Sequence, residues 1–235
     1  MPSRADVEAL QAANRGLTRL AERDLRAFWA TLDLTRPERA RDLLLQFTPA
    51  LVEQYGEAAA TVAADFYDDL RAAEGVPGRF SARMADPVSA ERVQARTRFA
   101  AQHLFTESPD QMLAFLAGAV SKYVLEPGRA TIVESTAADP AAAGWHRETR
   151  SSETYASGCD FCRRLVSRGA VYKESTARFA AHDDCHCVAL PSWDANAPEV
   201  EAMAYVASQR TSRMSPAQRE AHNKRVREWL AADAD

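Results

Sequence analysis

The fold is decided by residues 35–70, which read TRPERARDLLLQFTPALVEQYGEAAATVAADFYDDL. Apolar residues recur here at steps of three and four, the spacing that places side chains on one face of an α-helix. The stripe comprises Leu44, Phe47, Leu51, Tyr55, Ala58, Val62, Phe66 and Leu70. Pro49 interrupts the stretch but not the stripe, so we expect a kink there and not a helix end. Such a stripe favours the core of a helical bundle over a partner-binding face.

Sequence signals also mark where two helices should begin. Thr35 and Glu38 have the spacing of a capping box, in which each side chain accepts a hydrogen bond from the other residue's backbone N–H. Pro37 suits the first helical turn because its missing N–H would have no partner there. Ser108 and Gln111 repeat the same spacing. We therefore predict that one helix starts near each of these serine or threonine residues.

Three other segments share the helical spacing. They cover residues 5–32, 89–105 and 108–125, and the motif Glu-Pro-Gly that follows the last of them is expected to end it. Short links join the four predicted helices, as is usual between antiparallel neighbours in a bundle. The sequence thus predicts an α-helical domain over residues 1–128.

The chain changes character after residue 128. RATIVES (129–135) is interpreted as a short strand or arm, and VALPSW (188–193) alternates enough to predict a strand. A third capping pattern, from Ser215 to Gln218, predicts a charged helix. We expect an α+β, mainly α protein: the helical domain, a small zinc-stapled α+β module over residues 129–193, and a polar tail with a C-terminal helix over residues 194–235.

Composition narrows the class of protein. The chain has 235 residues, 46% of them hydrophobic, and a formal net charge of −4, which argues against a protein built mainly to coat nucleic acid. No apolar run approaches the roughly 18 residues needed to span a bilayer. The N-terminus lacks the apolar core of a signal peptide, so we expect a reducing compartment and no membrane contact. In that setting clustered cysteines favour a metal site over disulfides.

The four cysteines of the chain fall into two short groups. Cys159 and Cys162 have the CxxC spacing that places two thiolates at adjacent corners of a tetrahedron. A second group offers His182, Cys185 and Cys187, at a distance along the chain typical of zinc modules. The preferred set is Cys159, Cys162, His182 and Cys187, with Cys185 as the substitute for Cys187. Four protein ligands leave no position for water or substrate, so the Zn²⁺ is expected to be structural.

Other interpretations of these residues stay open. The four cysteines could form two disulfides, a CxxC could be a redox motif, and a cysteine–histidine pair could form a nucleophile. Nearby basic side chains could contact phosphate, but a solvated face explains them equally well. These basic residues are Arg163, Arg164, Arg168, Lys173 and Arg178.

A series of motifs in residues 129–193 resembles a known family. In order they are GWxR (Gly144, Trp145, Arg147), CDFC, SRGAVY, FAAHDDCHC and LPSW. Their order and spacing are similar to those of MuF-like minor head proteins of tailed bacteriophages, of the type found in phages of actinobacteria. The N-terminal helices fit the layout of that family without adding a diagnostic motif.

The resemblance implies a head morphogenesis protein that acts by protein–protein contacts. Its expected partners are the portal, scaffold or major capsid proteins, with DNA as a weaker possibility, and its expected location is the virion or, during assembly, the host cytoplasm. The alternative is a capsid maturation protease that processes head proteins. The sequence offers no nucleophile signature for it, so an enzyme is the less favoured interpretation.

Overall fold

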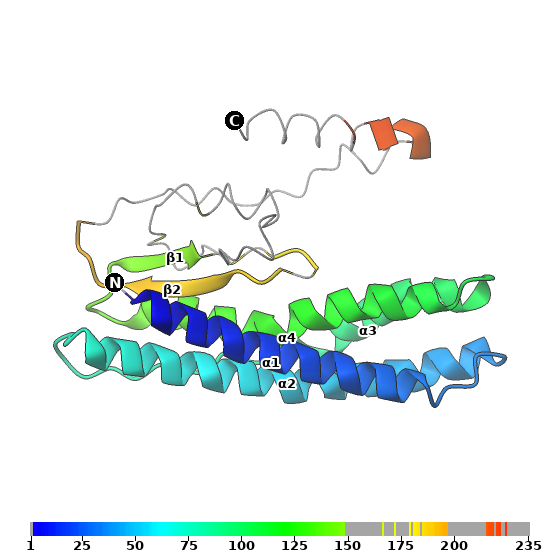
Figure 1. The fold of residues 1–235 in the computed structure, drawn as a ribbon, viewed down its shortest axis with the longest axis horizontal. Helices are drawn as coiled ribbons and strands as arrows, with labels where there is room; N and C mark the ends of the chain where they lie inside the picture. The colour runs from blue at the N-terminus through cyan, green and yellow to red at the C-terminus, as the bar shows by residue number, and fades with distance from the viewer. Residues whose placement is uncertain are drawn as a thin grey trace. The chain divides into compact units, whose positions relative to one another are not determined.

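Figure 1 shows a computed structural model of the chain. The structure describes residues 2–148, 166, 172, 179, 181–183, 185–196, 215–218, 220, 221 and 224. Residues 1–201 and 202–235 form two compact units, and each is described by itself. The first unit is mainly helical and carries a small antiparallel sheet, as the sequence predicted at the level of fold class.

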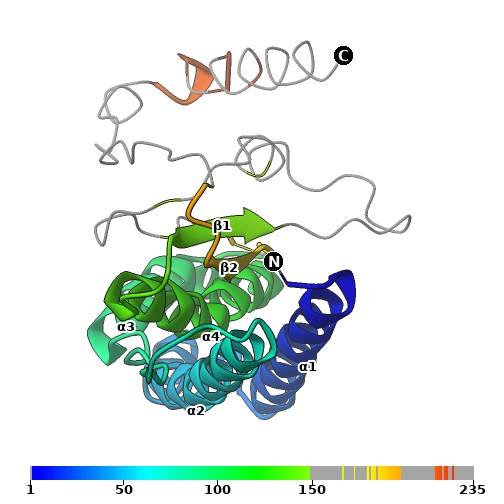
Figure 2. The ribbon, with the colours of Figure 1, turned by 90° about the vertical axis from the view of Figure 1, so that its left-hand side faces the viewer.

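Long helices make up most of the first unit. In chain order its elements are α1 (Arg4–Trp29), α2 (Pro37–Ala73), α3 (Ala90–Ala100), the 3₁₀-helix η1 (Ala101–Phe105), α4 (Asp110–Ala138), β1 (Gly144–Glu148) and β2 (Val188–Ser192). Helices α1, α2 and α4 run side by side, and the sheet lies along the C-terminal half of α4 (Figures 1 and 2). No described helix has both the length and the apolar character needed to cross a membrane.

Helix α4 is the centre of this unit. It packs on α1, α2 and α3 and on both strands, and its buried residues fall on every side. A helix that is apolar all round belongs in a protein core. The bundle core predicted from the sequence is therefore present, with α4 as its central helix and α2 packed along it.

The buried face of α2 differs from the predicted stripe in its C-terminal half. Ala58, Val62 and Phe66 are only partly buried. The residues that pack inward are mostly small, and they include Gly56, Ala59, Ala60, Ala63, Ala64 and Tyr67. The sequence prediction followed the large apolar side chains and so chose the face next to the buried one. Small residues form the buried face because they let two helices approach closely.

Gly128 on α4 shows how close that approach is. A Cβ atom added there would lie 2.8 Å from the backbone oxygen of Ala59. Backbone atoms cannot move aside as side chains can, so this position requires glycine. Pro127 fills the space opposite Gly56, where its Cγ atom would be 3.3 Å from an added Cβ. The proline and glycine of the motif Glu-Pro-Gly thus allow α2 and α4 to pack closely against each other.

The prediction that this motif ends the fourth helix is therefore wrong. Helix α4 continues through Pro127 to Ala138, and residues 129–135 are helical where the sequence suggested a strand or arm. Burial of Ile132 and Val133 outweighs the local preference of proline and glycine to end a helix. The predicted domain boundary at residue 128 falls inside α4, and the division into domains otherwise stays a prediction.

Helix α2 likewise continues through Pro49. Proline has no N–H to give to the carbonyl four residues earlier, so Leu45 loses its helical partner. The side-chain amide of Gln94 on α3 donates to that carbonyl at 3.4 Å. A neighbouring helix thus supplies the hydrogen bond that the proline removes.

The predicted helix starts are correct in part. At α2 the N-cap is Arg36, and the Thr35 hydroxyl binds Asp33 at 2.6 Å and not the helix backbone. At α4 the N-cap is Pro109, and its cap makes no side-chain hydrogen bond. The third pattern is a true capping box: the Gln218 side chain accepts from the Ser215 N–H, and the Ser215 hydroxyl accepts from the Gln218 N–H.

The sheet is formed by strands that are far apart in sequence. β2 coincides with the strand predicted from VALPSW, and it pairs antiparallel with β1 so that Trp145 faces Pro191 and Arg147 faces Ala189. The backbone of Trp145 exchanges two hydrogen bonds with Tyr172 on its other side, at 3.1 and 2.7 Å. Trp145 and Pro191 therefore form a pair without mutual hydrogen bonds, which is where a proline fits into a ladder.

Candidate metal centre

The structure describes the second half of the predicted ligand set. Cys185 and Cys187 directly precede β2 and are 3% and 2% exposed, and His182 is partly buried. Cys159 and Cys162 lie outside the described residues, as do Arg163, Arg164, Arg168, Lys173 and Arg178. Within the described part of the chain, no group of three or more Cys, His, Asp or Glu side chains could hold a metal ion. The four-ligand site stays a prediction.

A turn at Asp183 precedes Cys185, Cys187 and β2. The Cys185 N–H donates to the carbonyl of His182 at 3.3 Å. Nδ1 of His182 lies 2.5 Å from the carbonyl oxygen of Asp183. If Nδ1 carries the proton, Nε2 has the lone pair that a metal takes, which is the usual arrangement for a histidine ligand.

Two arginines from different helices hold this turn. Arg129 on α4 donates from Nη2 to the carbonyl oxygen of Cys185 at 2.5 Å and from Nε to that of Cys187 at 3.0 Å. Arg96 on α3 reaches the carboxylate of Asp183 at 2.6 Å. Arg129 is only 4% exposed, whereas the Arg96 side chain is 27% exposed. The buried contact fixes the backbone of both cysteines, and the outer one fixes the turn before them.

An aromatic ring, Phe179, lies beside the arginine that binds the cysteine backbone. The guanidinium of Arg129 lies 5.1 Å from the ring centre of Phe179, and that of Arg147 lies 3.8 Å from the same ring. Trp145 stacks on Tyr172 at 4.6 Å and lies 5.8 Å from Phe179. Desolvated contacts between arginine and an aromatic ring stabilise by about 2 kcal/mol or more. These rings therefore give the two cationic side chains a buried environment beside the cysteines.

Two described cysteines have the burial and the chemistry expected of ligands to a structural zinc ion. Cys185 and Cys187 form a buried cluster with Phe179 and Ala181, and buried thiol ligands are typical of closed zinc sites. Their backbone is fixed by Arg129, and such outer contacts usually orient metal ligands. The predicted set of four ligands, Cys159, Cys162, His182 and Cys187 with Cys185 as the substitute, stays a prediction, because its first two members lie outside the described residues.

A second buried polar group lies at the other end of β2. Asp139, the C-cap residue of α4, accepts from Nε of Arg71 at 2.9 Å, from the Tyr67 hydroxyl at 3.1 Å and from the Trp193 indole N–H at 3.1 Å, all through Oδ2. The backbone N–H of Ala141 donates to Oδ1 at 3.0 Å. The remaining guanidinium nitrogens of Arg71 bind carbonyl oxygens of residues 76–78. We call Tyr67, Arg71, Asp139 and Trp193 the Asp139 cluster.

Electrostatics in the Asp139 cluster favour the ionised carboxylate. Burial alone would raise the pKa of Asp139, but hydrogen bonds from Arg71, the Ala141 N–H, Trp193 and Tyr67 together lower it. Burial, the negative charge of Asp139 and their hydrogen bond raise the pKa of Tyr67. The cluster is thus a closed ion pair whose donors are all matched, as a stable buried pair requires.

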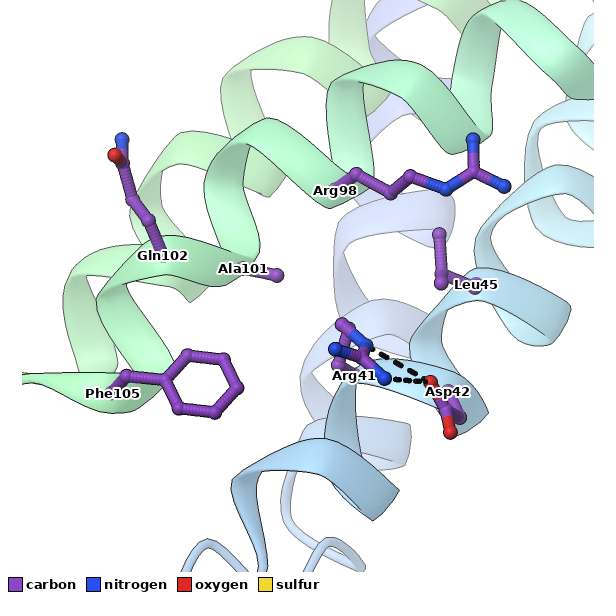
Figure 3. A pocket seen from close by; sticks show the side chains of 7 residues that line it. All are labelled: Arg41, Asp42, Leu45, Arg98, Ala101, Gln102 and Phe105. Atoms are coloured by element: carbon purple, nitrogen blue, oxygen red, sulfur yellow. Dashed lines mark hydrogen bonds and ion pairs between the residues drawn. The ribbon is translucent and has the colours of Figure 1, made fainter.

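A shallow cavity of about 450 Å³ lies away from both groups. Figure 3 shows its lining by Arg41, Asp42, Leu45, Arg98, Ala101, Gln102 and Phe105, from α2, α3 and η1. Arg41 and Asp42 form an ion pair at 2.8 Å, and both side chains are partly exposed. The lining offers no Ser, Cys or His, so this cavity supplies no nucleophile for a protease.

Sequence reasoning missed Arg129 and Asp139, the residues that attach the strand to the helices. The signal for Arg129 was a positive charge within the largely apolar stretch VLEPGRATIV, whose other charged residue is Glu126. A buried arginine there needs several acceptors, which implies a nearby segment with exposed carbonyls. Asp139 gave no comparable signal, because aspartate followed by proline is also a common turn sequence.

Comparison with known proteins gives one match. A family model described as VG15 protein matches residues 1–212, which include all the helices of the first unit, both strands and the cysteine groups. The same comparison found no matching curated protein and no matching solved structure.

Proposed function

The chain belongs to the VG15 family, a family of phage proteins, and from that premise we propose that it is a minor head protein acting in capsid assembly. It would act through protein–protein contacts, with portal, scaffold or major capsid proteins as partners. The MuF-like motifs between Gly144 and Trp193 support this assignment, because the family match extends over all of them.

One observation carries the proposal of a structural role. The cysteines of the HxxCxC motif are buried at the junction between α4 and β2, where Arg129 binds their backbone carbonyls. A metal site built into such a junction stabilises the fold, whereas a catalytic site needs an open coordination position. We infer a Zn²⁺ ion held by Cys159, Cys162, His182 and Cys187, with Cys185 as the substitute.

The proposed role in assembly can be tested with phage heads assembled in the presence and absence of the chain. The shell, scaffold and portal proteins of the phage that encodes the chain are co-expressed with and without it, and the heads are purified by sedimentation. We expect the chain to co-sediment with heads and the other head proteins to keep their lengths. A chain that stays in the soluble fraction would contradict the proposal, and shortened head proteins would favour a protease.

The metal is tested separately by native mass spectrometry of the purified chain. About one zinc ion per chain is expected, with loss of the ion on treatment with a strong chelator. A double substitution, Cys159→Ser with Cys162→Ser, should abolish binding. His103→Asn is the control, because His103 of η1 stacks on Phe115 of α4 and belongs to no proposed ligand set. A chain that carries no metal when purified from zinc-containing medium would remove the zinc site.

A further inference from the structure

We propose that Arg129 is the positioning residue of the metal centre: it shapes the Cys185–Cys187 turn for the ion before the ion binds. The inference rests on the proposed zinc site and adds a role for a residue on α4. One guanidinium joins the carbonyl oxygens of both cysteines, at 2.5 and 3.0 Å.

The geometry explains why these two contacts matter for ligands. In an extended segment, neighbouring side chains point to opposite faces and residues two apart share a face. Cys185 and Cys187 are two apart, so their thiols share a face if the backbone between them stays extended. Fixing the carbonyl of each cysteine fixes the dihedral angles of this short stretch. Arg129 therefore sets the direction of the Cys187 thiol and of its substitute, the Cys185 thiol, with one side chain.

Arginine suits this task better than lysine. Its planar guanidinium presents several donors at fixed angles, whereas an ammonium group is a single point charge on a flexible stem. Nε and Nη2 are the two donors used here, and they lie on the same edge of the plane. The ring of Phe179, 5.1 Å from the guanidinium carbon, limits its rotation. Lysine at residue 129 could keep the charge but could not hold both carbonyls in this way.

A purely structural role is the competing explanation. Arg129 is buried in α4, and its loss would destabilise the fold whether or not a metal binds. Arg71 provides the control for this possibility. It is also a buried arginine, 8% exposed, whose guanidinium binds several backbone carbonyls, but these belong to residues 76–78 and not to the cysteine turn.

The test compares Arg129→Lys with Arg71→Lys in the full chain. Zinc affinity is measured by competition with a chromophoric chelator at a temperature where both variants are folded by circular dichroism. Outer contacts of metal ligands typically change affinity by about 10–100-fold, so we expect a loss of that size in Arg129→Lys. Arg71→Lys should lower the unfolding temperature and leave the affinity within about twofold of the unsubstituted chain. Equal affinities in the two variants would overturn the inference.

A second measurement does not depend on a folded variant. Amide hydrogen exchange is followed in the metal-free, unsubstituted chain. If Arg129 holds the turn in advance, the Cys185 amide, which donates to the His182 carbonyl, stays protected when zinc is removed. Full exchange of this amide, with β2 still protected, would overturn the inference. If the unsubstituted chain binds no zinc but keeps this protection, the zinc site fails while the role of Arg129 in shaping the turn stands.

Discussion

At the start of β2 a guanidinium on α4 holds two backbone carbonyls, whereas at the end of β2 a carboxylate on α4 receives an indole N–H. Arg129 and Asp139 are thus two attachments of one strand to one helix. The first involves only α4 and the strand segment. The second also involves α2, because Asp139 pairs with Arg71 and Tyr67.

The two attachments differ in what can release them. Arginine keeps its charge at every pH at which proteins fold, so the Arg129 end does not titrate. The contact at Asp139 requires an ionised carboxylate, and it also requires that α2 and α4 keep their distance. The contact at the end of β2 next to the cysteines is therefore the less sensitive of the two to pH.

Removal of the Asp139 carboxylate should have the largest effect. Asp139→Ala leaves the guanidinium of Arg71 buried without its ion-pair partner, and loss of one member of a buried pair typically costs about 3–5 kcal/mol. The free energy of unfolding, measured by urea denaturation, should fall by that amount. Asp69→Ala on the exposed side of α2 is the control and should change stability by less than about 0.5 kcal/mol. Similar values for both variants would show that the Asp139 cluster does not stabilise the fold.

A methyl group added between α2 and α4 should disturb the contact at Asp139 and leave the contact at Arg129 nearly unchanged. Gly128→Ala places Cβ 2.8 Å from the Ala59 oxygen, so the helices must move apart at a cost of about 1–3 kcal/mol. Arg71 and Asp139 lie on different helices and should lose alignment, whereas zinc affinity should change little because Arg129 needs only α4.

Gly16→Ala gives the matched control for this prediction. A Cβ at residue 16 meets nothing within 4 Å, so alanine should stabilise α1 by about 0.5–1 kcal/mol. Urea denaturation of both variants checks the opposite signs. Stabilisation by Gly128→Ala would contradict the close approach of α2 and α4.

Loss of the indole N–H of Trp193 tests the one contact of the Asp139 cluster that comes from the strand segment. Trp193→Phe removes the hydrogen bond to Oδ2 and can keep the edge contact with the Tyr67 ring, whose centre is 5.5 Å away. A hydrogen bond to a charged group contributes about 1.5–3 kcal/mol, and the retained ring contact should hold the loss near the lower value. Amide exchange in β2 should increase at Ser192 more than at Val188. Equal increases at both ends would mean that the strand is released as a whole.

Acid should weaken the contact at Asp139 and leave the contact at Arg129 unchanged. Within the usual pH range we expect a smaller change in stability from this than from any of the substitutions above. The pKa of Asp139 in the folded chain is below its ordinary value, so its stabilisation is complete above the unfolded pKa of about 3.9. That stabilisation is lost as the pH falls through the lower, folded value. In urea denaturation between about pH 6 and pH 3, Asp139→Asn should remove this part of the pH dependence. An unchanged profile would show that other carboxylates account for it.

Local patterns predicted the helices and the strand at β2 because these elements follow from periodicity along the chain. The extension of α4 beyond Gly128 was missed, since its cause is the burial of Ile132 and Val133 after the helices pack. β1 was not predicted for a related reason. Its partners, Tyr172 and residues 188–192, are distant in sequence, and a short segment such as GWHRE shows no alternation of its own.

The candidate site shows the same division. Cysteine and histidine spacing identified His182, Cys185 and Cys187, and the structure places the two cysteines in a buried cluster. The residues that hold this segment, Arg129 and Arg96, come from helices far away in sequence. No spacing rule connects them to the cysteines, because that contact exists only after the helices pack.

The pairing of Trp145 with Pro191 also sets the hydrogen-bonding capacity of the outer edge of β2. The missing N–H of Pro191 lies on the side of β2 that faces away from β1, where a further strand would otherwise find a donor. All five residues of β2 are buried, and Pro191 is the fourth of them. A sheet edge with a complete row of donors can template the addition of another strand. The proline leaves a gap in that row, which makes this edge a poorer template for extension of the sheet.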